Sequence, residues 1–359
     1  MQSDLQKLYE SWSGLAVVSK FDAPTGAWIF ICLHDNTLGA CTGGTRIKVY
    51  DTLADGLEDA MRLAEGMTQK WASIQEMTGG GKAVIALDHP VEGEERAGLL
   101  RRYGQIINSL RGAFRTGEDL GSTSADMEII AEEAKYVHGF HPTEGHKVDP
   151  SPYTARGVFA GLRSAVAVVL GSDDLHGRTI LIQGTGNVGT NLGRLLVDAG
   201  AKLLVSDIDE DRARQAATEL GGAVVPSADV YSTECDVYAP CAIGATLNRQ
   251  TIPELQCRIV AGSANNQLEE AEDAQRLLER GIVYVPDYVV NAGGALSFAL
   301  MDRGLGDHQA LLGETDVIGT MIGEILSEAS SRNESPVAAA QRRVEQVLSG
   351  STAVPASAG

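Results

Sequence analysis

The sequence predicts an α/β protein of two domains, an N-terminal mixed-sheet α/β domain and a Rossmann domain, separated by a cleft. Three observations predict this class. At 359 residues the chain exceeds the size at which a single hydrophobic core stops growing. Short apolar runs alternate with helical stretches over residues 179–285, which is typical of a parallel sheet with right-handed crossovers. A glycine-rich turn, residues 184–189, stands at the first of these alternations.

The first elements expected are a hairpin and a strand. Apolar runs at residues 16–18 and 27–31 flank the turn-forming residues 22–26, and the second run is too continuous for a half-exposed strand. The next strand is predicted at residues 47–50, directly after the segment 43–46, which contains two glycines.

Helices complete this first domain. Apolar residues from 57 to 67 keep helical period, which places Lys70 beyond the C-terminal end of that helix face. A short buried strand is expected at residues 83–87, and further helices at 96–110 and 123–136. The first domain is therefore predicted to be a mixed sheet with helices.

Two lysines and an aspartate form the candidate site of this domain. Lys70 and Lys82 flank three glycines, residues 79–81, which we expect to form a turn whose bare backbone approaches a substrate closely and adopts positive φ. Asp119 lies between two further glycines, Gly117 and Gly121. The chemical interpretation is a substrate site with two lysine cations and Asp119 as the proton carrier. The alternative is a pair of solvated lysines and a turn aspartate.

A loop rich in His, Pro and Asp, residues 139–152, separates the first domain from the second. The histidines around it have no matching cysteine or carboxylate set, so we expect no metal site. A helix is predicted at residues 154–170. The strands expected after it lie at residues 179–183, 202–206, 223–225, 236–240, 258–261 and 282–285.

The glycine-rich turn follows a predicted strand and opens a helix. Its first glycine allows a tight turn, the second lets a pyrophosphate reach backbone N–H groups, and the third lets the helix pack on the sheet. Asp207 ends the next strand, where a carboxylate can bind the adenosine ribose and would repel a 2′-phosphate, so we expect NAD rather than NADP. The alternative is a structural glycine turn in another doubly wound protein. The cofactor-binding residues expected here are Gly184, Thr185, Gly186, Asn187, Val188, Gly189 and Asp207.

Asparagines framed by glycine follow two later strands, in residues 261–266 and 286–294. If these asparagines are buried, their amides can donate to and accept from a carboxamide or an amino acid, which suits a nicotinamide and its substrate. The alternative is that they close loops at positive φ.

Composition limits the partners and the compartment. A net charge of -19 argues against nucleic acid or an anionic membrane as partner. Five cysteines without C-x-x-C spacing indicate free thiols in a reducing compartment. The N-terminus lacks an apolar signal core, and no apolar run reaches about 18 residues. We therefore expect a cytoplasmic protein without a membrane partner, with a disordered tail at residues 350–359.

Taken in order, these segments resemble the amino-acid dehydrogenase family, which includes glutamate, leucine, valine and phenylalanine dehydrogenases. The resemblance covers nearly the whole chain. It rests on residues 43–46, 66–70, 79–82, 116–119, 184–189, 235–241 and 291–294. It implies a homo-oligomer that carries out reversible, NAD-dependent oxidative deamination of an L-amino acid to a 2-oxo acid and ammonia.

The resemblance also implies roles for individual residues. Lys82 is the catalytic lysine, Asp119 the proton-transfer carboxylate, and Lys70 the ligand of the substrate carboxylate. Asn266 and Asn291 help to hold substrate and nicotinamide. The other residues that it places at the substrate are Gly43, Gly44, Met67, Ala295 and Phe298, and those at the cofactor are Thr154, Ala239 and Pro240.

The substrate side chain can be inferred from the same resemblance. Thr42 and Phe298 stand where glutamate enzymes of the family carry the lysine and serine that hold the γ-carboxylate. A buried carboxylate without such partners is strongly disfavoured, so a neutral apolar side chain is expected against Met67, Ala295 and Phe298. Ala295 resembles the phenylalanine-type pocket, whereas leucine-type relatives carry valine, and Phe298 can stack on a ring or block it. We expect an aromatic L-amino acid, with branched-chain amino acids (leucine or valine) as the alternative.

The expected domains are residues 1–137 for substrate binding and catalysis, joined by a C-terminal helix at 330–349, and residues 138–329 for NAD binding.

Two other functions are less well supported by the sequence. A non-catalytic NAD-binding regulator has no need of Lys70, Lys82 and Asp119 together. A 2-hydroxy-acid dehydrogenase would need a His-carboxylate pair, and no motif places a histidine for that role.

Overall fold

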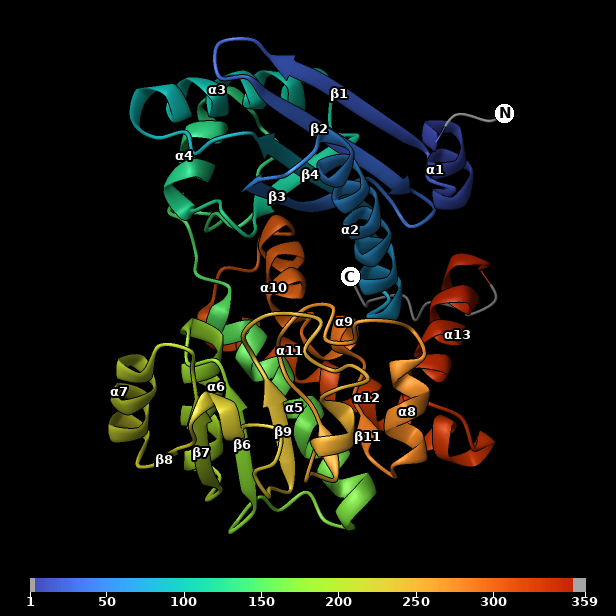
Figure 1. Ribbon diagram of the computed structural model, residues 1–359. Coiled ribbons are helices and arrows are strands. Elements are labelled where there is room, and N and C mark those ends of the chain that lie inside the picture. The colour runs from blue at the N-terminus through green and yellow to red at the C-terminus, as the bar shows by residue number, and fades with distance from the viewer. Residues whose placement is uncertain (1–3, 351–359) are drawn as a thin grey trace. The chain divides into compact units, whose positions relative to one another are not determined.

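The computed structural model describes residues 4–350, and it divides the chain into two compact units (Figure 1). The first unit extends to Val148 and takes up the chain again at Gln346, and the second is Asp149–Glu345. The tail expected to be disordered lies outside the described residues, apart from Gly350.

A five-stranded mixed sheet forms the centre of the first unit. Its strands are β1 (Ala16–Asp22), β2 (Ala27–Asp35), β3 (Cys41–Val49), β4 (Gly79–Leu87) and β5 (Phe114–Glu118), in the order β1-β2-β4-β3-β5. β2 pairs antiparallel with β1 and β4, and β3 pairs parallel with β4 and β5. The predicted hairpin and the mixed sheet are confirmed.

Helices cover both faces of this sheet. They are α1 (Asp4–Trp12), α2 (Leu53–Ser73), α3 (Gly93–Ser109) and α4 (Ser124–Glu133). Alternate residues of β2 point to opposite faces, so Phe30 packs with the α2 residues Ala60 and Met61, whereas Ile29 packs with the α3 residue Leu99. Two buried faces explain the continuous apolar run of β2. A capping box at Thr52 fixes the start of α2.

The prediction that residues 79–81 form a turn is wrong. These glycines begin β4, they are buried, and none of the three has a positive φ. Glycine is required here because α2 approaches the strand closely: a Cβ on Gly80 would lie 1.9 Å from Thr68 Oγ1 on α2. Likewise, residues 43–46 belong to β3 rather than preceding a strand. Lys70 lies within the last turn of α2 rather than beyond the helix.

A six-stranded parallel sheet forms the centre of the second unit. Its strands are β6 (Thr179–Gln183), β7 (Lys202–Ser206), β8 (Ala223–Val224), β9 (Val237–Pro240), β10 (Ile259–Val260) and β11 (Val283–Tyr284). Their order, β11-β10-β9-β6-β7-β8, is that of the Rossmann fold, with the reversal of strand order between β6 and β9. The predicted Rossmann fold is confirmed.

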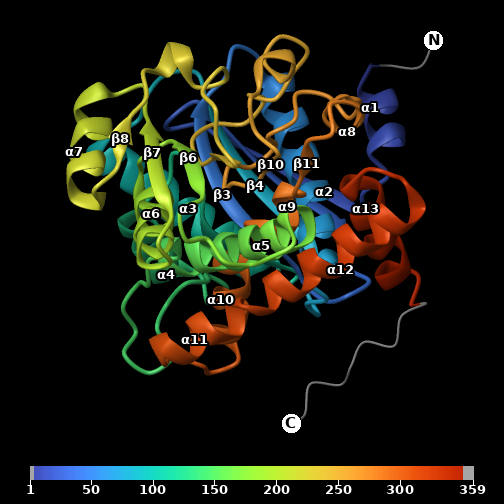
Figure 2. The ribbon, with the colours of Figure 1, turned by 90° about the horizontal axis from the view of Figure 1, so that it is seen from below.

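The helices of this unit are α5 (Ser151–Leu170), α6 (Asn187–Asp198), α7 (Glu210–Leu220), α8 (Asp273–Glu279), α9 (Asp287–Val290), α10 (Gly293–Asp302), α11 (His308–Thr315), α12 (Val317–Arg332) and α13 (Pro336–Leu348), with short 3-10 turns at Ser227–Asp229 and Ile252–Glu254. α5 lies alongside α12 (Figure 2) and also packs on α6 and α10. By length and composition α5 is one helix that could cross a membrane, but half of it is buried by these neighbours. We therefore interpret α5 as a core helix.

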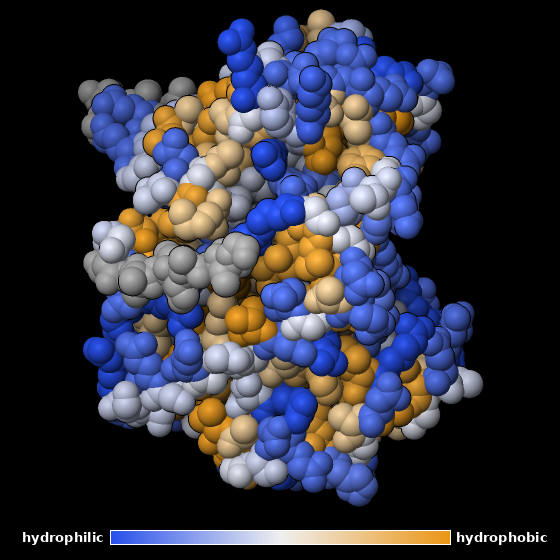
Figure 3. Space-filling view, turned by 180° about the vertical axis from the view of Figure 1, so that it is seen from behind, coloured by the Kyte–Doolittle hydropathy of each residue, from blue (hydrophilic) through white to orange (hydrophobic). Residues whose placement is uncertain are grey.

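The sequence boundaries between the two compact units differ from the expected domain limits. Residues 138–148 stay with the first unit because His138 N donates to Thr116 O at 2.7 Å and Lys147 Nζ donates to His138 O at 2.9 Å. Near the other end, α12 and most of α13 belong to the second unit. The face shown in Figure 3 carries hydrophobic residues in separate patches among hydrophilic ones.

Candidate functional site

Lys82 and Asp119 are brought together by the strand that lies between them. Lys82 is on β4 and Asp119 directly follows β5, and both strands pair with β3. The Lys82 Nζ and Asp119 Oδ1 atoms are 2.9 Å apart, with 6% and 17% of the side chains exposed. The alternative of solvated lysines and a turn aspartate is therefore wrong for this pair.

The two glycines of β3 make this approach possible. A Cβ on Gly44 would lie 2.8 Å from the Asp119 Cβ, and a Cβ on Gly43 would lie 1.8 Å from Gly81 O. Gly43 and Gly44 thus form the bare strip of backbone between the lysine strand and the aspartate loop.

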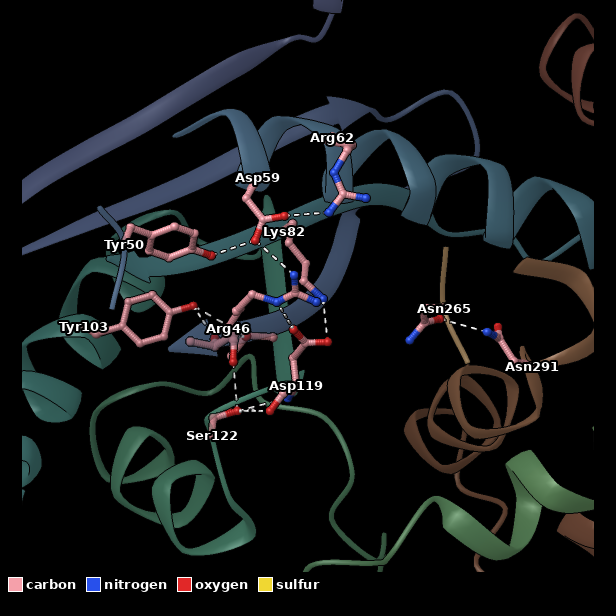
Figure 4. A network of polar contacts seen from close by, with 12 residues as sticks. Arg46, Tyr50, Asp59, Arg62, Lys82, Tyr103, Asp119, Ser122, Asn265 and Asn291 are labelled. Atoms are coloured by element: carbon pink, nitrogen blue, oxygen red, sulfur yellow. Dashed lines mark hydrogen bonds and ion pairs between the residues drawn. The ribbon is translucent and has the colours of Figure 1, made fainter. Parts of the chain in front are cut away.

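A second cation, Arg46, also binds the carboxylate of Asp119 (Figure 4). Arg46 Nε donates to Asp119 Oδ2 at 3.0 Å, and its Nη1 donates to Asp59 Oδ2 on α2 at 2.9 Å. Burial alone would raise the pKa of Asp119, but the charges of Lys82 and Arg46 outweigh it and hold this pKa at about 2. Asp119 is therefore an anion throughout the neutral pH range.

Sequence reasoning missed Arg46 and Asp59 as site residues. Arg46 stood in the quoted segment 43–46, two positions after Gly44, and alternate residues of a strand share a face. That spacing was the available signal. No such signal existed for Asp59, because this residue belongs to a helix that reaches this face of the sheet only in the folded protein.

Met67 and Lys70 lie on one face of the last part of α2, three residues apart. The Met67 side chain points at Gly43, since its Cγ would be 3.3 Å from a Cβ built there. Both residues are partly buried. This helix end is therefore held beside the glycine strip, where a substrate carboxylate could meet the lysine.

The glycine-rich turn of the second unit has the form that a dinucleotide requires. Gly184 has φ +99°, and a Cβ on Gly189 would lie 2.0 Å from Gly184 O, so both glycines are sterically required. A Cβ on Gly186 would meet nothing within 4 Å, which leaves its backbone open to a ligand. Asn187 and Val188 begin helix α6 there.

A polar cavity of about 410 Å³ opens at this turn. Its lining consists of Asp149, Thr185, Gly186, Asn187, Thr190, Asn191, Arg194 and Arg212. Exposed N–H groups at a helix N-terminus and two arginines fit a pyrophosphate.

Asp207 lies at the end of β7, buried beside the glycine-rich turn. Its Oδ2 atom accepts from Thr185 N at 2.8 Å and from Thr185 Oγ1 at 3.0 Å. Burial disfavours the charged form, but N–H donors from Thr185 and Asp209 lower the pKa of Asp207 below its ordinary value. The next residue, Ile208, is 93% exposed and presents an apolar surface suited to an adenine ring.

Of the asparagines, Asn291 is buried, whereas Asn265 and Asn266 are exposed, so the expectation of buried asparagines holds for one of the three. Asn291 Nδ2 donates to Asn265 Oδ1 at 2.8 Å and to Ser263 O at 3.2 Å. Asn266 has φ +51° and its backbone oxygen accepts from Ala245, so it closes a loop as the alternative proposed. Asn265 lies within the segment 261–266, but no role was predicted for it.

The Oδ1 atom of Asn291 is buried and has no hydrogen-bond partner among the described residues. A buried amide oxygen without a donor is costly, and a carboxamide N–H of a nicotinamide would satisfy it.

The remaining cofactor candidates lie near this amide and at the carboxyl end of the parallel sheet. Thr154 Oγ1 would be 2.6 Å from a Cβ on Gly294, so α5 packs closely on the start of α10. Ala239 and Pro240 end β9, and Pro240 O would be 2.2 Å from a Cβ on Gly262. Ala295 and Phe298 are partly buried and share a face of α10.

Residues 4–350 contain no group of three or more His, Cys, Asp or Glu that could hold a metal ion. The five cysteines, all within this range, are free.

Two family models match the chain. The model described as Glu/Leu/Phe/Val dehydrogenase, dimerisation domain, matches residues 25–136, and the model described as Glutamate/Leucine/Phenylalanine/Valine dehydrogenase matches residues 204–301. They fall in the first and second units, respectively.

Individual relatives match over most of their length. Leucine dehydrogenase of Bacillus subtilis is 40% identical over 343 residues, which cover 96% of this chain and 93% of that protein. Phenylalanine dehydrogenase of Lysinibacillus sphaericus is 40% identical over 334 residues, covering 92% and 87%. The crystal structure of L-tryptophan dehydrogenase from Nostoc punctiforme superposes with a TM-score of 0.81 at 36% identity, covering 96% of this chain and 98% of that one.

Proposed function

The chain belongs to the glutamate/leucine/phenylalanine/valine dehydrogenase family of oxidoreductases, and from this premise we propose that it deaminates an apolar, aromatic L-amino acid. The reaction is the reversible, NAD-dependent oxidation of the amino acid to its 2-oxo acid and ammonia. The observation that carries the proposal is the Lys82–Asp119 pair, 2.9 Å long and nearly excluded from water.

The residues of the first unit suit the acid-base steps. Lys70, on the last turn of α2, pairs with the substrate carboxylate and orients the Cα hydrogen. Lys82 polarises the developing carbonyl and activates the water that adds to the imine carbon. Asp119 takes the proton from the amino group or the water and returns one when ammonia leaves.

The residues of the second unit suit the cofactor. When bound, a nicotinamide dinucleotide accepts the hydride from Cα. Gly184–Gly189 would hold its pyrophosphate, Asn291 would accept from its carboxamide, and Thr154 would lie near its ring. Asp207 favours NAD, because a buried anion repels a 2′-phosphate and can bind ribose hydroxyls. Ala239, Pro240 and Asn266 complete the proposed cofactor set.

The preference for an apolar substrate side chain is inferred from the absence of charged groups at the proposed pocket positions. Thr42 is buried, and its hydroxyl donates to Ala40 O at 3.3 Å, so this position supplies no cation for a γ-carboxylate. Ala295 leaves space on α10, and Phe298 on the same face offers a ring for stacking. Glutamate is therefore disfavoured and an aromatic side chain is favoured. Leucine or valine remains the second candidate, because leucine dehydrogenases are 40% to 44% identical to this chain and the phenylalanine enzyme is 40% identical.

The test is the value of kcat/KM for phenylalanine, tryptophan, leucine, valine and glutamate, measured by NADH formation at 340 nm. An aromatic amino acid is expected at the top and glutamate at the bottom. Glutamate at the top would refute the pocket argument, and valine far above phenylalanine would refute the aromatic preference alone. No turnover of any of them would favour a non-catalytic NAD-binding regulator.

We also propose a division of labour between domains, with residues 1–137 for substrate and catalysis, aided by the C-terminal helix, and residues 138–329 for NAD. The description of the first family model as a dimerisation domain supports a homo-oligomer. The reduced cysteines are in keeping with a cytoplasmic location.

A further inference from the structure

Backbone and hydroxyl groups fix the loop that carries Asp119 to β3. Ser122 Oγ donates to Thr45 O at 2.8 Å, and Asp119 N donates to Ser122 Oγ at 2.9 Å. Ile47 N donates to Leu120 O at 3.0 Å. These bonds determine where the backbone of Asp119 lies. They leave the rotation of its carboxylate to be determined by other groups.

Two cations determine that rotation, one for each oxygen. Lys82 binds Oδ1 at 2.9 Å and Arg46 binds Oδ2 at 3.0 Å (Figure 4). They differ in chemistry, because a lysine can give up its proton during a reaction whereas an arginine stays charged. When Lys82 is neutral or turned toward a substrate, Arg46 is the remaining cation on Asp119.

Arg46 is itself held from the far side by Asp59. Arg46 Nη1 donates to Asp59 Oδ2 at 2.9 Å, and Tyr50 OH donates to the same oxygen at 2.6 Å. Arg62 Nη2 binds the other oxygen, Oδ1, at 2.7 Å from the exposed side of α2. Asp59 therefore fixes the guanidinium plane by one edge while Nε is presented to Asp119.

We propose that Arg46 is a positioning residue for the reaction, holding the Asp119 carboxylate in place through proton transfer, and that Asp59 holds Arg46. The proposal rests on the proposed deamination. In this arrangement Lys82 and Asp119 exchange protons with the substrate, and Arg46 binds only the carboxylate oxygen of Asp119 that faces away from Lys82. Its effect reaches the chemistry only through Asp119, so its loss should slow the proton-transfer step.

The test uses a variant designed to keep the fold. Arg46→Gln alone leaves Asp59 without its buried partner, so Arg46→Gln is combined with Asp59→Asn, which removes both charges together. Arg46→Lys keeps one charge but cannot bind both carboxylates through a planar fork. Arg101→Gln combined with Glu132→Gln is the control, since this ion pair of the same unit is exposed, by 41% and 53%, and lies outside the network of Asp59 and Asp119.

For each protein, kcat and KM are measured with the best amino acid, together with the solvent deuterium effect and the Cα-deuterium effect on kcat. The double variant is expected to lose about 10²-fold in kcat, as misplaced catalytic groups do, with KM within about threefold. Its solvent effect should rise and its Cα effect should fall, because proton transfer becomes slower than hydride transfer. Arg46→Lys should be intermediate, and the control with Arg101→Gln and Glu132→Gln should match the wild type.

A folded double variant with wild-type kcat would overturn the proposal. So would a loss of kcat in which the two isotope effects keep their wild-type ratio, because a general loss of packing slows all steps alike. If the wild-type protein turns over no amino acid, the proposed function fails instead, and the two failures are thereby distinct.

Discussion

At the residue scale, the charges of neighbouring side chains determine the ionisation of Asp119. Asp119 is held as an anion by Lys82 and Arg46, and its pKa of about 2 lies below the roughly 3.9 of an unfolded aspartate. A folded-state pKa below the unfolded value stabilises the protein above pH ~4, and this contribution is lost as the pH falls toward 2.

We therefore expect Asp119→Asn to remove part of the acid sensitivity of the fold. The free energy of unfolding of the wild type should exceed that of the variant most at pH 6 to 7, and the difference should shrink as the pH falls to about 3. Urea unfolding at a series of pH values measures this. A difference that stays constant over the range would show that Asp119 is not held ionised in the folded protein.

Asp207 leads to a second prediction at this scale. Initial rates with NAD should far exceed those with NADP, and Asp207→Ser should narrow the gap, because the buried anion is gone and Arg212, 3.8 Å from it, is freed for a phosphate. The exposed Asp198→Asn serves as the control and should leave the ratio unchanged. Equal rates of the wild type with both cofactors would contradict the assignment.

At the scale of elements, the contact of α2 with β4 positions Lys82. Thr68 on the helix packs directly on the glycine backbone of the strand, at Gly80. The helix α2, the strand β4 and the two lysines were predictable from the sequence. The contact between α2 and the glycines of β4 was not, because three successive glycines ordinarily indicate a turn. Nothing local reveals that another element covers them. For the same reason the pairing of Arg46 with Asp59, thirteen residues apart on a strand and a helix, was not predictable.

By contrast, the alternation of strands and helices in the second unit was predictable, because each β-α step is local and each strand contains a short apolar run. The ends of the strands were less predictable: the strand expected at 258–261 is the shorter β10, Ile259–Val260. The roles of the two adjacent asparagines were also not predictable, since only the fold shows that Asn265 accepts from Asn291 whereas Asn266 adopts a positive φ in a loop.

Gly80→Ala should separate α2 from β4 and destabilise the fold by about 1–3 kcal/mol, the usual cost of overpacking. Activity should fall too, because the neighbouring Lys82 moves with the strand. Gly66→Ala on the same helix is the matched control, since a Cβ there meets nothing within 4 Å. It should raise stability by about 0.5–1 kcal/mol. Thermal or urea unfolding of both variants provides the measurement, and equal stabilities would contradict the close contact.

At the scale of the whole molecule, the acid-base residues and the dinucleotide turn belong to different units. Lys82→Ala should therefore lower kcat by about 10³-fold or more while the Kd for NADH, measured by fluorescence, stays within about twofold. The exposed Lys20→Ala, on β1, should alter neither quantity. A loss of NADH affinity as large as the loss of rate would refute the division of labour.

The interrupted first unit has a consequence for synthesis on the ribosome. Its hydrophobic clusters draw on residues between Leu8 and Val137, so its core is complete before the second unit emerges. Residues Gln346–Gly350 appear only after all of Asp149–Glu345 has been made, roughly 10–40 seconds later at roughly 5–20 residues per second. The N-terminal core can therefore fold before the ribosome has made Gln346–Gly350, the described residues that rejoin it.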